Sequence, residues 1–217
     1  MFRNIRRRAT ASSGRPLFVR IRIAAPMERV WELTQDPGLH ARWDARFSAI
    51  VPTGPLAGGG TRFHYERRLM RHTIHGTGVT IGERLRPDGT RTSALRFGTD
   101  DPLSPLGEGR GYWRYEPDGD GVVFSTGYDY LPGWGRLLDR LVLRRLIGWM
   151  TAWSFDRLRI WAETGMPPER WPAASVLWLW RPDRPRAGRC GRVPARRGTH
   201  ADVMAAAPHT LAGLAAP

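Results

Sequence analysis

The sequence predicts an α+β fold in which a curved, seven-stranded antiparallel sheet wraps around one long C-terminal helix. Strand patterns follow one another from Ala45 to Leu131 and are separated only by turn signals. Trp134–Thr164 then runs without proline, which corresponds to roughly 45 Å of α-helix. Consecutive strands joined by short turns pair antiparallel, and this helix is the only element long enough to cover one sheet face.

The chain ahead of these strands predicts one more strand and two short helices. Leu17–Ala24 alternates apolar residues with arginine, as a half-buried strand does. Met27–Leu33 has the apolar spacing of a short amphipathic helix. A breaker at residues 36–38, Asp-Pro-Gly, ends that helix, and Leu39–Trp43 has room for a second one.

Six further strands complete the predicted sheet, with Pro52–Gly60 as a glycine-rich loop between two of them. These strands are Ala45–Val51, Thr61–Leu69, Thr73–Leu85, Thr90–Gly98, Gly107–Glu116 and Val122–Leu131. The last two form a hairpin through turn residues 117–121. We expect one face of this hairpin to point inward, and in simple register it carries Trp113, Tyr115, Val123, Ser125 and Asp129.

The long helix carries an apolar stripe that we expect to face the sheet. The stripe consists of Leu138, Val142, Leu146, Trp149, Ala152, Trp153 and Ile160, and it also holds two charged residues, Arg145 and Asp156. Because a buried charge is costly unless it is paired, each of these two must meet a strand group, a ligand or water.

The far side of the helix is apolar as well, at Leu143, Ile147, Met150 and Leu158. One hypothesis is that the apolar segment Val176–Trp180 folds back and covers this side. The alternative is that the segment is a chance hydrophobic run in a floppy tail.

Composition divides the chain into a basic, disordered arm over residues 1–16, a domain over 17–165, and a tail over 166–217. The tail is rich in Pro, Arg and Ala, which predicts that most of it is disordered. The single cysteine, Cys190, excludes a disulfide within the chain and fits a reducing, cytoplasmic location. The longest uncharged run of the long helix, Leu146–Phe155, is too short to span a bilayer.

The net charge of +14 is a weaker sign of nucleic-acid binding than it first looks. All 34 basic residues are arginine, which indicates GC-rich coding bias, and they are scattered through the predicted strands. We therefore expect no nucleic-acid partner, and at most a weak association with anionic membrane surfaces. The sequence does not determine the oligomeric state.

The segment VRIRIAAPMERVWELTQDPGLHARW, residues 19–43, resembles the start of the START-like superfamily, also called SRPBCC. This superfamily has polyketide cyclase/dehydrase and lipid-transfer members. The matching features are the strand and, after it, Ala25-Pro26, Val30-Trp31, Asp36-Pro37 and Trp43-Asp44. The resemblance covers about residues 17–165 and implies the helix-grip fold, with a hydrophobic small molecule bound between the sheet and the C-terminal helix. It carries over no catalytic residue, because the family has no universal catalytic motif.

The candidates for lining such a cavity combine large aromatic walls with a few polar groups. They are Trp43, Phe63, Tyr65, His75, Trp113, Ser125, Asp129, Arg145, Trp149, Trp153 and Asp156. The aromatic bulk could equally fill the interior. His75 shares a strand side with Val79 and Ile81, which allows it to point inward, and a structural histidine is the alternative. No metal site and no cofactor motif are expected.

Three functions remain open from the sequence. The first is binding or carriage of a hydrophobic molecule such as a lipid, a polyketide or an isoprenoid-like compound. The second is a cyclase or dehydratase, which needs a positioned acid or base that His75, Asp129 and Arg145 would have to supply. The third is a protein-partner module that uses the exposed helix face and the tail.

Overall fold

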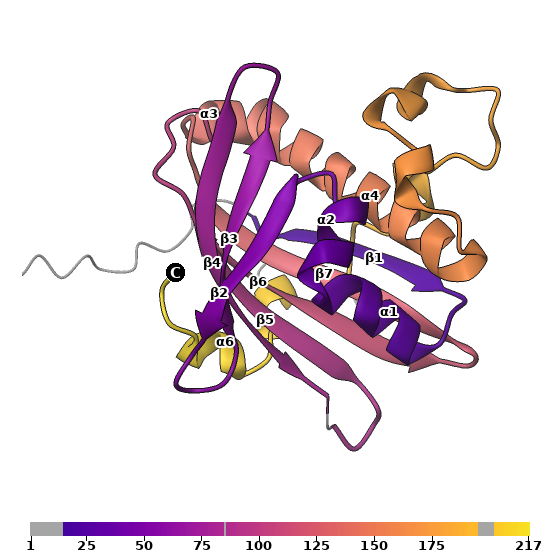
Figure 1. Cartoon of the computed structure of the whole chain (residues 1–217), viewed down its shortest axis with the longest axis horizontal. Coiled ribbons are helices and arrows are strands. Elements are labelled where there is room, and N and C mark those ends of the chain that lie inside the picture. The colour runs from indigo at the N-terminus through magenta and orange to yellow at the C-terminus, as the bar shows by residue number, and fades with distance from the viewer. Residues whose placement is uncertain (1–14, 85, 195–201) are drawn as a thin grey trace, which may run out of the picture.

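The computed structural model describes residues 15–84, 86–194 and 202–217. Seven strands form one antiparallel sheet in the order β1-β7-β6-β5-β4-β3-β2 (Figure 1). The strands are β1 (Leu17–Ile23), β2 (Ala49–Pro55), β3 (Thr61–Arg68), β4 (Thr73–Glu83), β5 (Arg91–Gly98), β6 (Leu106–Asp118) and β7 (Gly121–Pro132). The expected strand end at Leu85 and residues 1–14 of the expected arm lie outside the described residues.

Two short helices and one long helix pack on the concave face of this sheet (Figure 1). They are α1 (Met27–Gln35), α2 (Pro37–Trp43) and a continuous helix made of α3 (Arg136–Leu138), a π-helical turn η1 (Asp139–Leu143) and α4 (Arg144–Thr164). This arrangement confirms the predicted helix-grip fold. Shorter pieces follow α4: η2 (Pro168–Arg170), η3 (Ala173–Leu177), η4 (Ala187–Arg189), α5 (Asp202–Ala205) and α6 (Thr210–Gly213).

Strand β2 lies later in the chain than the sequence predicts. It includes Pro52, which was expected to start a loop, and its pairing with β3 shifts register between Pro52 and Gly54. Proline lacks the N–H that a strand between two neighbours needs, but β2 is the edge of the sheet, where proline and such irregularities are tolerated.

In its first turns the long helix faces the sheet with the side that was expected to face away, whereas Ala152, Trp153 and Ile160 of the expected inner stripe are buried. Leu143 and Ile147 form a buried cluster with Tyr128 and Tyr130 of β7, and the hydroxyl oxygens of Thr151 and Tyr128 lie 2.9 Å apart. Leu138, Val142 and Leu146, which were expected to point inward, are instead 43–52% exposed. Both sides of this helix are apolar, so periodicity alone could not distinguish them.

The chain after Gly165 covers the other side of α4, although its composition predicted disorder. The thiol of Cys190 donates to the carbonyl oxygen of Ala152 at 3.1 Å. The fully buried carboxylate of Asp156 accepts from Arg159 Nε at 2.7 Å, from the backbone N–H of Arg186 at 2.7 Å and from Arg189 Nη1 at 2.8 Å. This part of the tail is therefore held by specific contacts, and residues 195–201 lie outside the described residues.

The segment that was expected to cover the helix does not do so. Within Val176–Trp180, only Val176 packs against the core, while Leu177, Leu179 and Trp180 are 72–74% exposed. The hypothesis was wrong because the sheet itself covers Leu143 and Ile147.

The last described residues pack on the convex face of the sheet. Leu211 and Leu214 form a buried cluster with Val79 of β4 and Ala94 of β5. The Tyr112 hydroxyl of β6 donates to the carbonyl oxygen of Val203 at 2.8 Å. The apolar residues on this side of β4 are therefore explained by the C-terminal segment.

We predict that Asp156→Asn lowers the free energy of unfolding by about 2–4 kcal/mol, because it breaks a buried charge network and leaves arginines without their partner. The matched control is Asp183→Asn, which breaks the exposed pair with Arg181 and should cost less than about 1 kcal/mol. Urea denaturation measures both values. Equal losses in the two variants would contradict an ordered tail over α4.

Candidate functional site

The β6–β7 hairpin decides which strand residues face the interior. Its turn has two residues, since Asp118 already pairs with Gly121, so Trp113 lies opposite Thr126 and Tyr115 lies opposite Phe124. The sequence-based register was centred on a longer turn, and a shift of one residue moves side chains to the other face. Val123, Ser125 and Asp129 therefore lie on the convex side, which corrects the expectation for Ser125 and Asp129.

A cavity of about 360 Å³ lies between the concave face of the sheet and the short helices α1 and α2. This volume falls within the usual range for small-molecule sites and equals about a dozen water molecules. The cavity is lined by Thr34, Gln35, Pro37, His40, Phe47, Ile50, Pro52, Gly60, Thr61, Phe63, Thr80, Gly82, Ser93, Leu95 and Trp113. We expected a cavity against the C-terminal helix, but α4 contributes no residue to this one.

The α1–α2 corner brings polar groups to one side of the cavity. Asp36 ends α1 and caps α2, where its carboxylate accepts from the backbone N–H of Leu39 at 2.8 Å. Thr34 and Gln35, just before the corner, both bond to the Tyr115 hydroxyl, at 2.7 and 2.8 Å. The corner thus fixes two polar side chains at the rim of a mostly apolar space.

Glycines in β4 help to keep the cavity open. The ring of Phe63 lies over Gly78 and the ring of Tyr65 lies over Gly76, so closely that an added Cβ would come within 2.3 and 2.2 Å of ring carbons. Any larger residue at either position would push an aromatic ring away from the sheet. The Phe63 ring can therefore form a flat wall.

His40 is the titratable residue in the cavity wall. Its ring stacks on Trp43 with 5.0 Å between centroids and meets the edge of Trp113 at 4.7 Å. Its Nε2 lies 3.1 Å from Oδ2 of Asp44, which is fully buried and also accepts from Arg46 Nη2 at 2.6 Å. The ring is thus oriented by a carboxylate that an arginine holds in turn.

Burial and neighbouring charges shift the pKa values of His40 and Asp44 in opposite directions. Burial lowers the pKa of His40 below its ordinary value and outweighs the opposing hydrogen bond from Asp44. Burial alone would raise the pKa of Asp44, but the charge of Arg46 and the hydrogen bonds from His40 and Arg46 hold it well below the usual range. At neutral pH the site therefore contains a neutral imidazole beside an ionised carboxylate.

Only two of the expected site residues, Phe63 and Trp113, line this cavity. Trp43 and Tyr65 are buried beside it, against His40 and Phe47. His75 is exposed on the convex side of β4, 3.9 Å from Glu66, so it is not a cavity group.

The expected helix residues also lie elsewhere. Trp149 and Trp153 stack on each other at 6.4 Å outside the cavity lining, and Asp156 binds the tail. His40, which sequence reasoning missed, could have been found from its spacing, since Trp43 and Asp44 follow it at i+3 and i+4 on one helix face.

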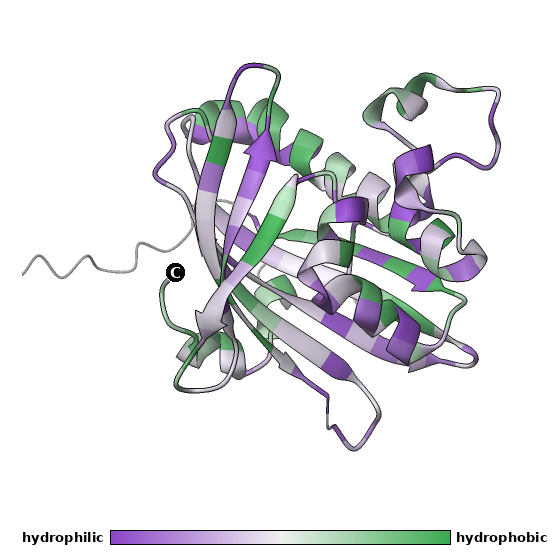
Figure 2. Cartoon of the chain, viewed as in Figure 1, coloured by the Kyte–Doolittle hydropathy of each residue, from purple (hydrophilic) through white to green (hydrophobic). Residues whose placement is uncertain are grey.

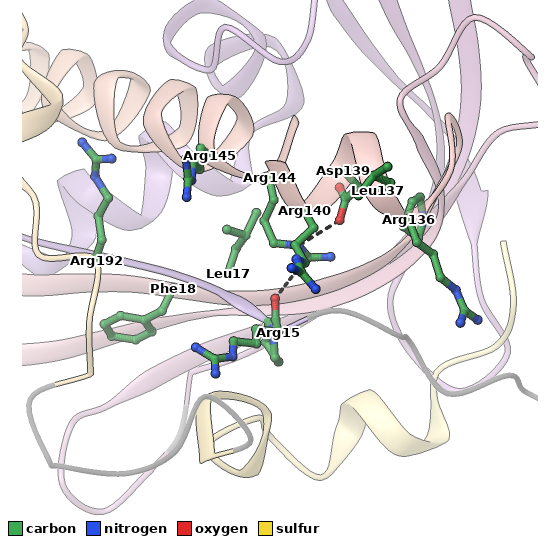
Figure 3. Close-up of a pocket in the computed structure, with 13 residues that line it drawn as sticks. Arg15, Leu17, Phe18, Arg136, Leu137, Asp139, Arg140, Arg144, Arg145 and Arg192 are labelled. Atoms are coloured by element: carbon green, nitrogen blue, oxygen red, sulfur yellow. Dashed lines mark hydrogen bonds and ion pairs between the residues drawn. The ribbon is translucent and has the colours of Figure 1, made fainter. Parts of the chain in front are cut away.

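Arg145 lies in a second, larger groove of about 980 Å³ between the first turns of the long helix and the ends of β1 and β7 (Figure 3). Six arginines line it: Arg15, Arg136, Arg140, Arg144, Arg145 and Arg192. This groove and the cavity share no lining residue, so His75, Asp129 and Arg145 do not form one catalytic set.

Comparison with known proteins agrees with this fold. Residues 17–162 match the family described as polyketide cyclase / dehydrase and lipid transport. The chain is 38% identical over 171 residues to the "uncharacterized membrane protein YndG" of Bacillus subtilis (strain 168), covering 76% of this chain and 64% of that one. The chain thus spans less than two thirds of that relative's length. No described helix is long and apolar enough to cross a bilayer.

Solved structures show the same fold at low sequence identity. A STAR-related lipid transfer protein from Xanthomonas axonopodis has a TM-score of 0.51 at 18% identity, over 70% of this chain and 88% of that one. The di-domain ARO/CYC StfQ of the steffimycin biosynthetic pathway has a TM-score of 0.52 at 13% identity, over 67% and 49%. The START-like resemblance is confirmed by these matches and the family match.

We predict that wild-type stability falls as pH drops from about 7 to about 5, because the unfolded chain then binds a proton that buried His40 resists. The sign follows from the lowered pKa: this stability is fully present above the unfolded pKa of about 6.5 and is lost as pH falls through the folded pKa. The slope from one proton is at most about 1.4 kcal/mol per pH unit. Urea melts should show a weaker dependence in His40→Gln, and identical slopes would contradict the prediction.

Proposed function

Because this chain belongs to the polyketide cyclase / dehydrase and lipid transport family, we propose that it binds or carries a small hydrophobic molecule in the α1–α2 cavity. The observation that carries the proposal is the cavity of about 360 Å³ itself, with its apolar walls and one polar side. A lipid, polyketide or isoprenoid-like compound would place its apolar part against Phe63, Leu95 and Trp113.

The polar side would fix the orientation of such a ligand. Thr34, Gln35 and His40 lie at one part of the wall, and the hydroxyls of Thr80 and Ser93, 3.1 Å apart, lie on the sheet. Each of these groups already has a hydrogen-bond partner in the protein, and a ligand with one or two hydroxyl or carbonyl oxygens could use the lone pairs and N–H groups that remain, whereas a pure hydrocarbon could not. The chemistry therefore favours an oxygenated hydrophobic ligand.

A cyclase or dehydratase is the second candidate, and His40 is the observation that favours it. A neutral imidazole in a cavity wall can accept a proton from a substrate, and Asp44 stabilises the imidazolium that forms. This role replaces the set of His75, Asp129 and Arg145, which the structure disperses.

We predict that Ile50→Trp, which fills the cavity from the edge strand β2, weakens binding of the neutral fluorophore N-phenylnaphthylamine by about tenfold or more. The matched control is Val51→Trp, whose side chain is already 56% exposed and should leave binding unchanged. Fluorescence titration measures both. Equal affinity of the two variants for the fluorophore would show that it does not bind in this cavity.

Native mass spectrometry of protein purified from its own host separates the two candidates. A carrier should retain the same ligand mass in wild type and in His40→Gln. If His40 abstracts a substrate proton and returns it to the departing hydroxyl, which leaves as water, the variant should retain a ligand heavier by one water molecule than that of the wild type. A ligand retained equally by Ile50→Trp would place it outside this cavity.

A further inference from the structure

The first turns of the long helix, with Trp134 just before them, present an apolar surface to solvent. We call it the α3–α4 surface, and its residues are 43–70% exposed: Trp134, Leu137, Leu138, Leu141, Val142 and Leu146. Leu137 with Leu141, and Leu138 with Val142 and Leu146, form two adjacent rows at i, i+4 spacing. Figure 2 shows hydrophobic and hydrophilic bands alternating along these turns. A cluster of this kind on a folded protein marks a contact site.

The arginine groove runs along the same turns (Figure 3). Four of its six arginines belong to this helix: Arg136, Arg140, Arg144 and Arg145. Asp139 is the one acidic residue among the groove residues, and it is buried and bonded to the Tyr130 hydroxyl and to Arg144 Nε at 3.0 Å. Six arginines minus one aspartate leave a net charge of +5 in the groove.

These charges have few partners within the described part of the chain. Arg144 pairs with Asp139, but its Nη2 is buried and makes no hydrogen bond there. Arg136, Arg140 and Arg145 are exposed and form no ion pair with a described carboxylate. The groove is therefore open to several anionic groups at once.

We propose that the α3–α4 surface and the arginine groove together dock this protein on the surface of an anionic phospholipid bilayer. The leucines and Trp134 would enter the interface between headgroups and acyl chains, while the arginines bind lipid phosphates. Such an interface stabilises an apolar helix face flanked by arginines. The acyl chains bury the apolar side chains, and the lipid phosphates neutralise the arginines.

Charge argues against the other occupants of this surface. A symmetric contact between two copies would bring two groove charges of +5 close together, which opposes association. A nucleic acid would neutralise the arginines but leave the exposed leucines in water. Of these three occupants, an anionic bilayer is the one that satisfies both halves of the surface. This docking does not depend on the ligand cavity, since the two sites share no residue.

Vesicle flotation of the full chain tests the proposal, with vesicles of phosphatidylcholine alone or mixed with phosphatidylglycerol. We expect binding to the mixed vesicles only, and weaker binding at high salt. Arg136→Gln/Arg140→Gln/Arg145→Gln should lower partitioning about a hundredfold, at about fivefold for each arginine. Leu137→Gln/Leu141→Gln should lower it as well, because it removes the inserted apolar groups.

Matched controls distinguish binding through this surface from binding through overall positive charge or through exposed apolar residues elsewhere. Arg62→Gln/Arg71→Gln/Arg170→Gln removes the same charge from exposed positions elsewhere, and Leu177→Gln/Leu179→Gln removes exposed leucines from the tail. Both should bind mixed vesicles as wild type does, and all four variants should still bind N-phenylnaphthylamine.

Three results would overturn the proposal. The first is failure of wild type to bind the mixed vesicles. The second is an equal loss in the matched controls, which would assign binding to overall charge. The third is a dimer in sedimentation velocity, or binding to a DNA oligonucleotide without vesicle binding, which would assign the surface to a second copy or to nucleic acid.

Discussion

Contact among three buried aromatic rings holds the layers of this protein together. Phe124 of β7 stacks on Phe155 of α4 at 4.6 Å, and Trp43 of α2 meets Phe155 at 6.0 Å and Phe124 at 6.5 Å. All three are fully buried, and each pair contributes about 0.5–1.5 kcal/mol beyond the area that it removes from water. The sheet, the short helix α2 and the long helix therefore meet at this one contact.

The α1–α2 cavity and the arginine groove lie in different parts of the described structure and share no lining residue. Toward the β2 edge, α1 and α2 bridge the sheet over glycines and small polar residues, which leaves the α1–α2 cavity. Beside the first turns of the long helix, six arginines line an open, positively charged groove. A single helix-grip scaffold thus separates a mostly apolar cavity from a cationic surface. In our proposals the first holds a ligand and the second meets a bilayer.

The fold could be predicted from the sequence, but most of the candidate site could not. Strand alternation, turns and one long proline-free segment are local properties, and they identified every strand and the three main helices. The site depends on which face of a strand or helix each side chain occupies, and this is set by pairing with distant parts of the chain. Ser125 and Asp129 changed faces because the register of the β6–β7 hairpin differs by one residue from the expected one. His75 was expected to point inward because of the apolar residues beside it, but those residues pack against the C-terminal segment.

The sequence by itself determined the order of the elements, the family and the aromatic character of the interior. Only the tertiary structure decided which side of the long helix is buried, because both sides are apolar and the tail competes with the sheet for them. It also decided that Asp156 is a structural charge and that His40 faces the cavity. The physical reason is that pairing and burial join residues far apart in the chain, and periodicity carries no information about such partners.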